Sequence, residues 1–228
     1  MTTPRYDIYR LIHKGLRLFM ADTLTAAGTL DAGDPAAVAE VTGRVRALLA
    51  FCRAHVRHEN GFVHTAMEAR APGSAAAVAG DHDHHLADIA ALEELADAVA
   101  AGRADAHTLY RRLAVFVGEN LVHMEQEEGR NNAVLWQAFQ DEEIMAIERA
   151  IVDSQPPADK MLTIRWIAAA ATPAERTAFL AAVRAAVPPA AFAAILEMVG
   201  PHLRPAERDA LALAAWGAGT RSPPAAAG

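Results

Sequence analysis

Cysteine is nearly absent from the 228-residue chain, in which Cys52 stands alone. A single cysteine excludes an intramolecular disulfide and suits a reducing compartment. Residues 1–5 contain no apolar signal-peptide core, so we expect a cytoplasmic protein. The chain also lacks any uncharged run of about 18 apolar residues, which is the length that a membrane-spanning helix needs. The sequence therefore predicts no contact with a membrane.

Positive charge is scarce as well. Lysine occurs only as Lys14 and Lys160, so arginine supplies most of the positive charge, and the formal net charge is −7. Without a basic stripe to neutralise phosphates, the chain is not expected to bind nucleic acid. Hydrophobic residues make up 53% of the chain, as in ordinary globular proteins. The length suffices for one sizeable helical domain and a smaller appendage.

Four consecutive segments repeat apolar residues at alternating steps of three and four, which is the core-facing seam of a helix in a bundle. The seams are Tyr9, His13, Leu16, Met20, Thr23; Val38, Val41, Val45, Leu48, Cys52, His55, Glu59, Phe62, Ala66; Val78, His82, His85, Ile89, Leu92, Ala96, Val99; and Leu109, Leu113, Phe116, Asn120, His123, Glu127. Short loops between long amphipathic helices imply antiparallel neighbours. The sequence thus predicts an all-α fold, an up-down-up-down four-helix bundle with a small C-terminal helical extension.

Capping and breaking residues set the expected helix boundaries. The first helix should begin at Pro4, with Thr3 as its N-cap, and run to about Ala27. The next three are expected over residues 35–70, over residues 74–102, and from the N-cap Asp105 onward. We predict residues 1–153 to form the bundle with one following helix, residues 154–217 a small helical region, and residues 218–228 a disordered tail.

The C-terminal region follows a linker at residues 155–157. Its start signals, a capping box at Thr172–Glu175 and prolines at 188–189 and 205, predict three or four short helices. Their docking residues are expected to be Trp166, Phe179, Phe192, Ile195 and Trp216. Because this region carries no cluster of metal-ligand residues, we expect it to be dispensable for metal binding and to offer a surface to a protein partner.

Histidine lies in all four predicted seams, and two seams add a carboxylate one turn later. Imidazole and carboxylate at positions i and i+4 project from one helix face and together can hold a metal ion. Burying both without partners would be costly, and the recurrence in four helices favours metal binding over four separate structural roles. The candidate ligands are His13, His55, Glu59, His82, His85, His123 and Glu127.

In the third helix the order of preference is His85, then His82, because both share the seam, with Asp81 as a further alternative. The remaining histidines receive structural interpretations. His64, His107 and His202 are expected at the surface, and Cys52 is interpreted as a small packed hydrophobe.

The fourth helix offers two carboxylates. Helix geometry places Glu127 about 40° from His123 and Glu128 about 140° away, so Glu127 is the predicted ligand. Glu128 should then face a helix boundary or solvent, and Glu128→Ala should leave the metal content intact. A bulge near Gln126 would reverse this order.

Four pieces of the chain resemble the hemerythrin-like family, the HHE cation-binding domain, over roughly residues 4–150. They are Leu11–Arg17, His55-x-x-His58-Glu59, Asp81–His85 and His123–Glu128. The resemblance implies a four-helix bundle that holds two non-haem irons, with histidines as terminal ligands and two bridging carboxylates. The oxygen carriers of the family would select Glu128 by their five-residue spacing, whereas other members use four. Manganese or zinc stay as alternatives to iron.

Five histidines and two carboxylates suit two octahedral ions with one position left for O2, peroxide or nitric oxide. The first function that this implies is a di-iron protein that binds a small diatomic ligand or senses oxygen, redox state or iron. The second is a di-iron enzyme acting on peroxide, O2 or NO, for which Tyr9 is the one evident proton donor. The third is a helical interaction module with a structural metal. All three stay open at the level of sequence.

Overall fold

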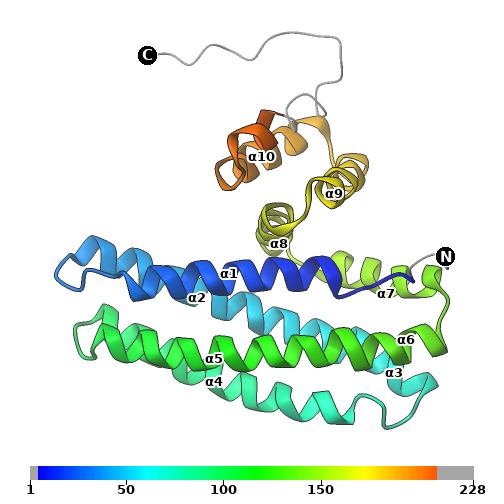
Figure 1. The fold of residues 1–228 in the computed structure, drawn as a ribbon, viewed down its shortest axis with the longest axis horizontal. Helices are drawn as coiled ribbons and strands as arrows, with labels where there is room; N and C mark the ends of the chain where they lie inside the picture. The colour runs from blue at the N-terminus through cyan, green and yellow to red at the C-terminus, as the bar shows by residue number, and fades with distance from the viewer. Residues whose placement is uncertain (1–4, 210–228) are drawn as a thin grey trace.

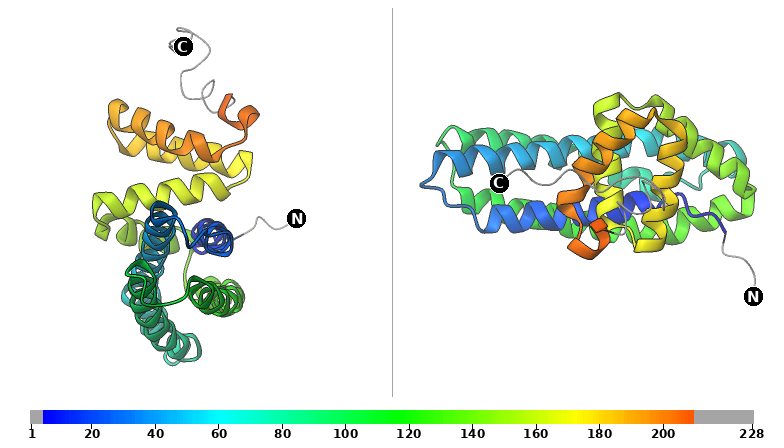
Figure 2. Two further views of the ribbon diagram at one scale, coloured as in Figure 1. Left: turned by 90° about the vertical axis from the view of Figure 1, so that its left-hand side faces the viewer. Right: turned by 90° about the horizontal axis from the view of Figure 1, so that it is seen from above.

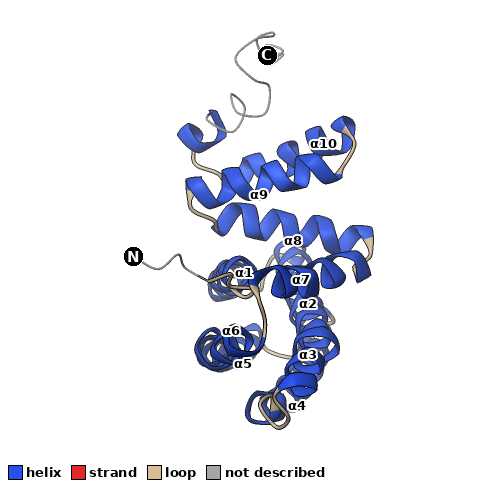
Figure 3. Ribbon diagram, turned by 90° about the vertical axis from the view of Figure 1, so that its right-hand side faces the viewer, coloured by secondary structure: helices blue, strands red, loops and turns tan. Residues whose placement is uncertain are grey.

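The computed structural model describes residues 5–209, which contain helices and no strand (Figures 1 and 3). Four long helices dominate: α1 (Arg10–Gly28), α2 (Pro35–His58), α4 (Ala76–Ala100) and α5 (Ala106–Gln126). Helix α1 packs against α2 and α5, and α4 packs against the same two helices. Successive long helices run in opposite directions (Figure 1). The predicted all-α class is confirmed.

The apolar seams form the core between the four long helices. Every residue predicted in the seams of the first, third and fourth segments is buried, and Leu16, Leu48, Ile89 and Leu113 are at most 1% exposed. Full burial of a leucine or isoleucine stabilises a fold by about 1.5–3 kcal/mol, so these seams hold the helices together. Cys52 is buried among them, and burial raises the pKa of its thiol to about 12. Its interpretation as a packed hydrophobe is confirmed.

Helix α1 begins later than predicted. Residues 5–9 are not helical, and the Asp7 carboxylate accepts hydrogen bonds from the backbone N–H groups of Tyr9 (3.1 Å) and Arg10 (3.2 Å). The expected start at Pro4 was therefore wrong, because Asp7 caps the helix. The preceding segment is held across the bundle end, where the Trp136 indole N–H donates to the Tyr6 carbonyl at 2.8 Å. The predicted N-cap Thr3 lies outside the described residues.

Two of the long helices continue through a π-helical segment. Helix α2 passes through η1 (Glu59–His64) into α3 (Thr65–Arg70), and α5 passes through η2 (Glu127–Asn131) into α6 (Asn132–Ala138). A π-turn takes about one residue more than an α-turn. The seam predicted to continue at Phe62 and Ala66 is therefore wrong there: both are half-buried, whereas His64 and Met67 are buried.

The chain continues into α7 (Asp141–Ser154), α8 (Pro157–Ala170), α9 (Pro173–Ala186), α10 (Pro189–Val199) and the short 3-10 helix η3 (Gly200–His202). The capping box predicted at Thr172 and Glu175 is present. Helices α8 to α10 lie in layers on the side of α1 and α2 (Figure 2). The predicted docking residue Trp216 and the predicted tail 218–228 lie outside the described residues.

Helix α8 packs directly along α1. The rings of Phe19 and Trp166 stack with their centroids 4.1 Å apart. Gly15 allows the close approach, because a Cβ atom there would lie 3.2 Å from the backbone of Trp166 and of Ile167. Helices α8 to α10 also have an apolar cluster of their own, whose buried members include Leu180, Phe192, Ile195 and Val199. A domain boundary near residue 153 stays a prediction.

Candidate metal centre

Six of the seven predicted ligands converge in the core between the long helices. His13 comes from α1, His55 from the last turn of α2, His82 from α4 and His123 from the last turn of α5. Glu59 and Glu127 are the first residues of η1 and η2. Their donor atoms form two groups whose members lie within 4.8 Å of one another. The groups are His13, His55, Glu59, Glu127 and Glu59, His82, His123, Glu127.

The two glutamates belong to both groups, and each lies close to histidines of both pairs. Glu59 Oε1 lies 3.0 Å from His55 Nε2 and 3.7 Å from His13 Nε2, whereas its Oε2 lies 3.5 Å from His82 Nε2. Glu127 Oε1 lies 3.6 Å from His82 Nε2. Its Oε2 lies 3.5 Å from the Nε2 atoms of both His13 and His123. This is the arrangement that a carboxylate needs to bridge two ions.

Most of the donor atoms are buried and without partners, which tests whether metal ions fit, whereas the Nε2 atoms of His82 and His123 lie 2.9 Å from each other. Within the described part of the chain, no hydrogen bond is made by either carboxylate oxygen of Glu59 or Glu127, nor by Nε2 of His13 or His55. Orphaned buried polar atoms are costly. Ligands about 2.1 Å from an octahedral ion are about 3.0 Å apart when adjacent and about 4.2 Å apart when opposite. The observed carboxylate–imidazole separations, from 3.0 to 3.7 Å, lie within this range, so the residues fit two cations.

The outer ring nitrogens of three histidines have side-chain partners. His13 Nδ1 lies 3.0 Å from Glu128 Oε1, His82 Nδ1 lies 2.7 Å from Asn60 Oδ1, and His123 Nδ1 lies 3.4 Å from Asp81 Oδ2. Histidines that bind metals usually donate their second N–H to such an acceptor, which orients the ring and fixes its tautomer. The pattern therefore leaves Nε2 of each ring to face the centre.

Glu128 lies at the boundary between η2 and α1, which agrees with the position predicted from the sequence, but its contacts there support a candidate ligand. Besides its contact with His13, it accepts a hydrogen bond from the Arg17 guanidinium at 2.6 Å, and its side chain is 30% exposed. The hydrogen bonds from His13 and Arg17 lower the pKa of Glu128 to about 2. Helix α5 stays α-helical through Gln126, so Glu127 reaches the centre and Glu128 supports His13 from behind.

Two further histidines lie beside the centre. His85 is buried, and its ring lies edge-on to that of His123 with 4.6 Å between centroids, but it belongs to neither donor group. His64, expected at the surface, is 5% exposed, and its ring stacks on His82 with 5.0 Å between centroids. Neither nitrogen of His64 has a hydrogen-bond partner in the part of the chain that the structure describes. Its surface assignment was wrong because η1 turns it inward.

The carboxylates and imidazoles have pKa values shifted by burial and by one another. Burial and the charge of Glu59 raise the pKa of Glu127 well above its ordinary value. Burial acts on Glu59 in the same sense, but the imidazoles of His55 and His13 outweigh it and hold its pKa well below. Burial lowers the pKa of His82 to about 3 and also that of His123. Metal ligation needs ionised carboxylates and neutral imidazoles, so only the raised pKa of Glu127 opposes it among these four.

Residues 5–132 match the family model described as the hemerythrin HHE cation-binding domain. The chain belongs to this family. The match ends within η2 and α6, so it spans all six converging ligands and stops before α7. No curated protein and no solved structure matches the chain. Among the described residues, no helix is both long and apolar enough to cross a membrane.

Sequence reasoning missed the roles of His64, Asn60 and Glu128, yet the sequence contains a signal for them. The pattern His-x-x-x-Glu-x-Gly occurs twice, at His55–Gly61 and at His123–Gly129. In both copies the π-helical segment begins at the glutamate. Glycine weakens an α-helix, so its recurrence two residues after each ligand marks the places where the helical register changes.

Proposed function

We propose that this HHE-domain protein binds two non-haem iron ions in an up-down-up-down four-helix bundle and uses them to bind O2 or another small diatomic ligand, or to sense oxygen, redox state or iron. The observation that supports this most is the sharing of Glu59 and Glu127 between two groups of donors. One group would hold an ion through His13 and His55, the other through His82 and His123. Manganese and zinc accept the same donor types and are the alternative metals. A helical interaction module whose metal is structural is the alternative function that needs no reactive site.

The six converging ligands would leave coordination positions unfilled on two octahedral ions, and iron there would supply reversible binding or reduction of a small oxygen or nitrogen species. The chain's own contribution is to keep this region dry and oriented. Tyr9 is 2% exposed, and its hydroxyl oxygen accepts a hydrogen bond from Asn131 at 3.1 Å. Burial and the charges of Glu127 and Glu59 raise its pKa well above the ordinary value, so it keeps its proton. Tyr9 is therefore suited to donate a hydrogen bond into the centre.

An enzyme that acts on peroxide, O2 or NO is the second candidate, and one observation favours it. A cavity is lined by His55, Glu59 and Tyr9 on one side of the centre. This cavity is larger than a diatomic molecule needs, so it offers space for a larger substrate. A protein partner for helices α8 to α10 and a cytoplasmic location stay predictions.

Metal analysis with an optical spectrum tests the proposal. Protein saturated with iron under reducing conditions should hold close to two ions per chain, and exposure to O2 or NO should change its visible spectrum reversibly. Turnover of added peroxide would identify the enzyme instead. One ion per chain at saturating iron would rule out the dinuclear centre, and preferential loading with zinc would favour the structural module.

A further inference from the structure

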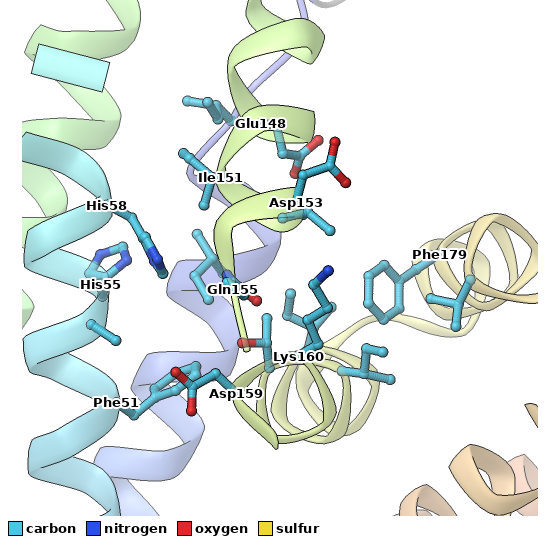
Figure 4. A pocket seen from close by; sticks show the side chains of 18 of the residues that line it. Phe51, His55, His58, Glu148, Ile151, Asp153, Gln155, Asp159, Lys160 and Phe179 are labelled. Atoms are coloured by element: carbon cyan, nitrogen blue, oxygen red, sulfur yellow. The ribbon is translucent and has the colours of Figure 1, made fainter. Parts of the chain in front are cut away.

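A cavity of about 360 Å³ lies between the bundle and the C-terminal helices (Figure 4). Residues of α1 and α2 form one wall, and residues of α7, α8 and α9 form the others. Small-molecule sites typically have volumes of about 300–1,000 Å³. At the roughly 30 Å³ that a water molecule occupies in the liquid, this space accommodates a molecule of about a dozen non-hydrogen atoms.

The walls of the cavity are mainly apolar. Side chains from five helices contribute, among them Ile12, Phe51, Ile151, Ile164, Phe179 and Val183. At the inner end the cavity meets His55, whose side chain is 14% exposed, whereas those of the other five ligands are at most 6% exposed. No hydrogen bond to the outer nitrogen of His55 is found among residues 5–209. An occupant of the cavity would thus touch the candidate centre at His55, its most exposed ligand, beside Glu59.

The charged groups around the cavity differ in whether they are free to pair with a ligand. Lys160 is the one lysine or arginine of the lining, and it forms no ion pair within the described chain. Figure 4 shows its ammonium group among the lining side chains rather than turned away from them. Glu148 is engaged by the Tyr6 hydroxyl, and burial raises its pKa. Asp153 is exposed, and Asp159 is half-buried beside Lys160 in α8.

We propose that this cavity binds a monocarboxylate with an apolar body of about nine carbons, whose carboxylate pairs with Lys160. The apolar body then lies against the side chains of α1, α7 and α9 and reaches His55. An apolar lining with one charged group that fixes orientation is the usual composition of such sites. Its binding is independent of the proposed iron chemistry. Only its effect on the metal ions, through contact with His55, rests on the proposed function.

Isothermal calorimetry on the full chain as purified, with whatever metal it carries, measures binding of decanoate, 1-decanol and decylammonium. Lys160→Gln should weaken decanoate binding about tenfold, because a charge-assisted hydrogen bond is lost, and leave the weaker binding of 1-decanol unchanged. Val183→Trp fills the space from α9 and should abolish binding of both. Arg184→Gln removes a charge from the exposed side of the same helix and should change neither.

Decylammonium that binds as tightly as decanoate would overturn the assignment of the carboxylate to Lys160. Unchanged decanoate binding in Val183→Trp would overturn the cavity itself. On iron-loaded protein, decanoate should shift the visible spectrum, and Val183→Trp should abolish the shift. If the chain binds decanoate but takes up no iron at saturating iron, the proposed function is disproved and the carboxylate site stands. Two bound irons without decanoate binding would have the reverse meaning.

Discussion

The two halves of the candidate metal centre share both glutamates but differ in their surroundings. The His13 half, formed with His55, adjoins the cavity, and its His13 faces two carboxylates that outweigh burial and raise its pKa. The His82 half, formed with His123, is enclosed by two further histidines, and burial lowers the pKa values of its imidazoles. One half therefore adjoins the cavity and contains an imidazole whose pKa is raised, whereas the other is enclosed and its imidazoles have lowered pKa values, which favours the neutral form that a metal requires.

Removing a glutamate that both halves share should weaken metal binding in both halves. Glu127→Ala is expected to reduce the metal content from two ions per chain to one or none, with the remaining affinity lowered by more than about 100-fold, because a ligand matters more than its outer partner. The measurement is metal analysis after iron titration. Glu125→Ala, an exposed site on the same helix, is the matched control. Two tightly held ions in Glu127→Ala would show that Glu127 is not a ligand.

Removing a residue that contacts the outer ring nitrogen of one histidine should weaken metal binding in one half only. Glu128→Ala is expected to weaken the metal of the His13 half by about 10- to 100-fold and to leave the other ion in place. Asp81→Ala should do the converse through His123, with a smaller effect, because its contact is longer (3.4 Å) and its side chain is 46% exposed. Stepwise titration followed by spectroscopy resolves the two ions. Unchanged metal binding in Glu128→Ala would restore the interpretation drawn from the sequence.

Acidity should affect the halves unequally. Metal ions must displace protons from groups whose pKa is raised, Glu127 and His13, so the apparent affinity should fall as the pH drops, by about tenfold per unit for each proton displaced. His82, with a pKa of about 3, is neutral above pH 5 and should release none. Calorimetry in two buffers of different ionisation enthalpy counts the protons. Glu128→Gln should reduce the count and Asp81→Asn should not; an affinity that rises towards low pH would contradict the assignment.

Much of the bundle could be predicted from sequence because a helix in a bundle buries one stripe along its whole length. The three-four rhythm placed His13, His82 and His123 on the core face, and all three are buried. The same rhythm could not separate His82 from His85, since both lie in the buried stripe and only the level along the bundle distinguishes them. The rhythm assumes an unbroken α-helix, so it misplaced Phe62 and overlooked His64 where η1 begins.

The remaining differences depend on contacts between distant parts of the chain. Helix α1 starts after Asp7 rather than at Pro4, because residues 5–9 contact α6 and α7 more than a hundred positions away. Glu128 was assigned to a helix boundary or solvent from its angle on an isolated helix, and that angle could not show that α1 brings His13 and Arg17 to it. Periodicity describes one helix at a time, so it contains no information about either partner. The cavity likewise could not be predicted, because it forms only where α8 packs beside α1, and no local sequence pattern gives the position of α8.

The two π-helical segments each act as a one-residue insertion in an otherwise continuous helix. One residue corresponds to about 100° of rotation in an α-helix, so everything beyond each segment faces a different direction from the ligand-bearing part. At the end of η2 and directly after it, this rotation brings Asn131 to Tyr9 and Asn132 to the carboxylate of Asp7. The orientation of the ligands is thus fixed by the part of the helix before the π-turn. The orientation of the residues that hold the N-terminal segment is fixed by the part after it. A single deletion or insertion in η2 after Glu127 would therefore reorient the distal end of the helix, while His123 and Glu127 kept their orientation.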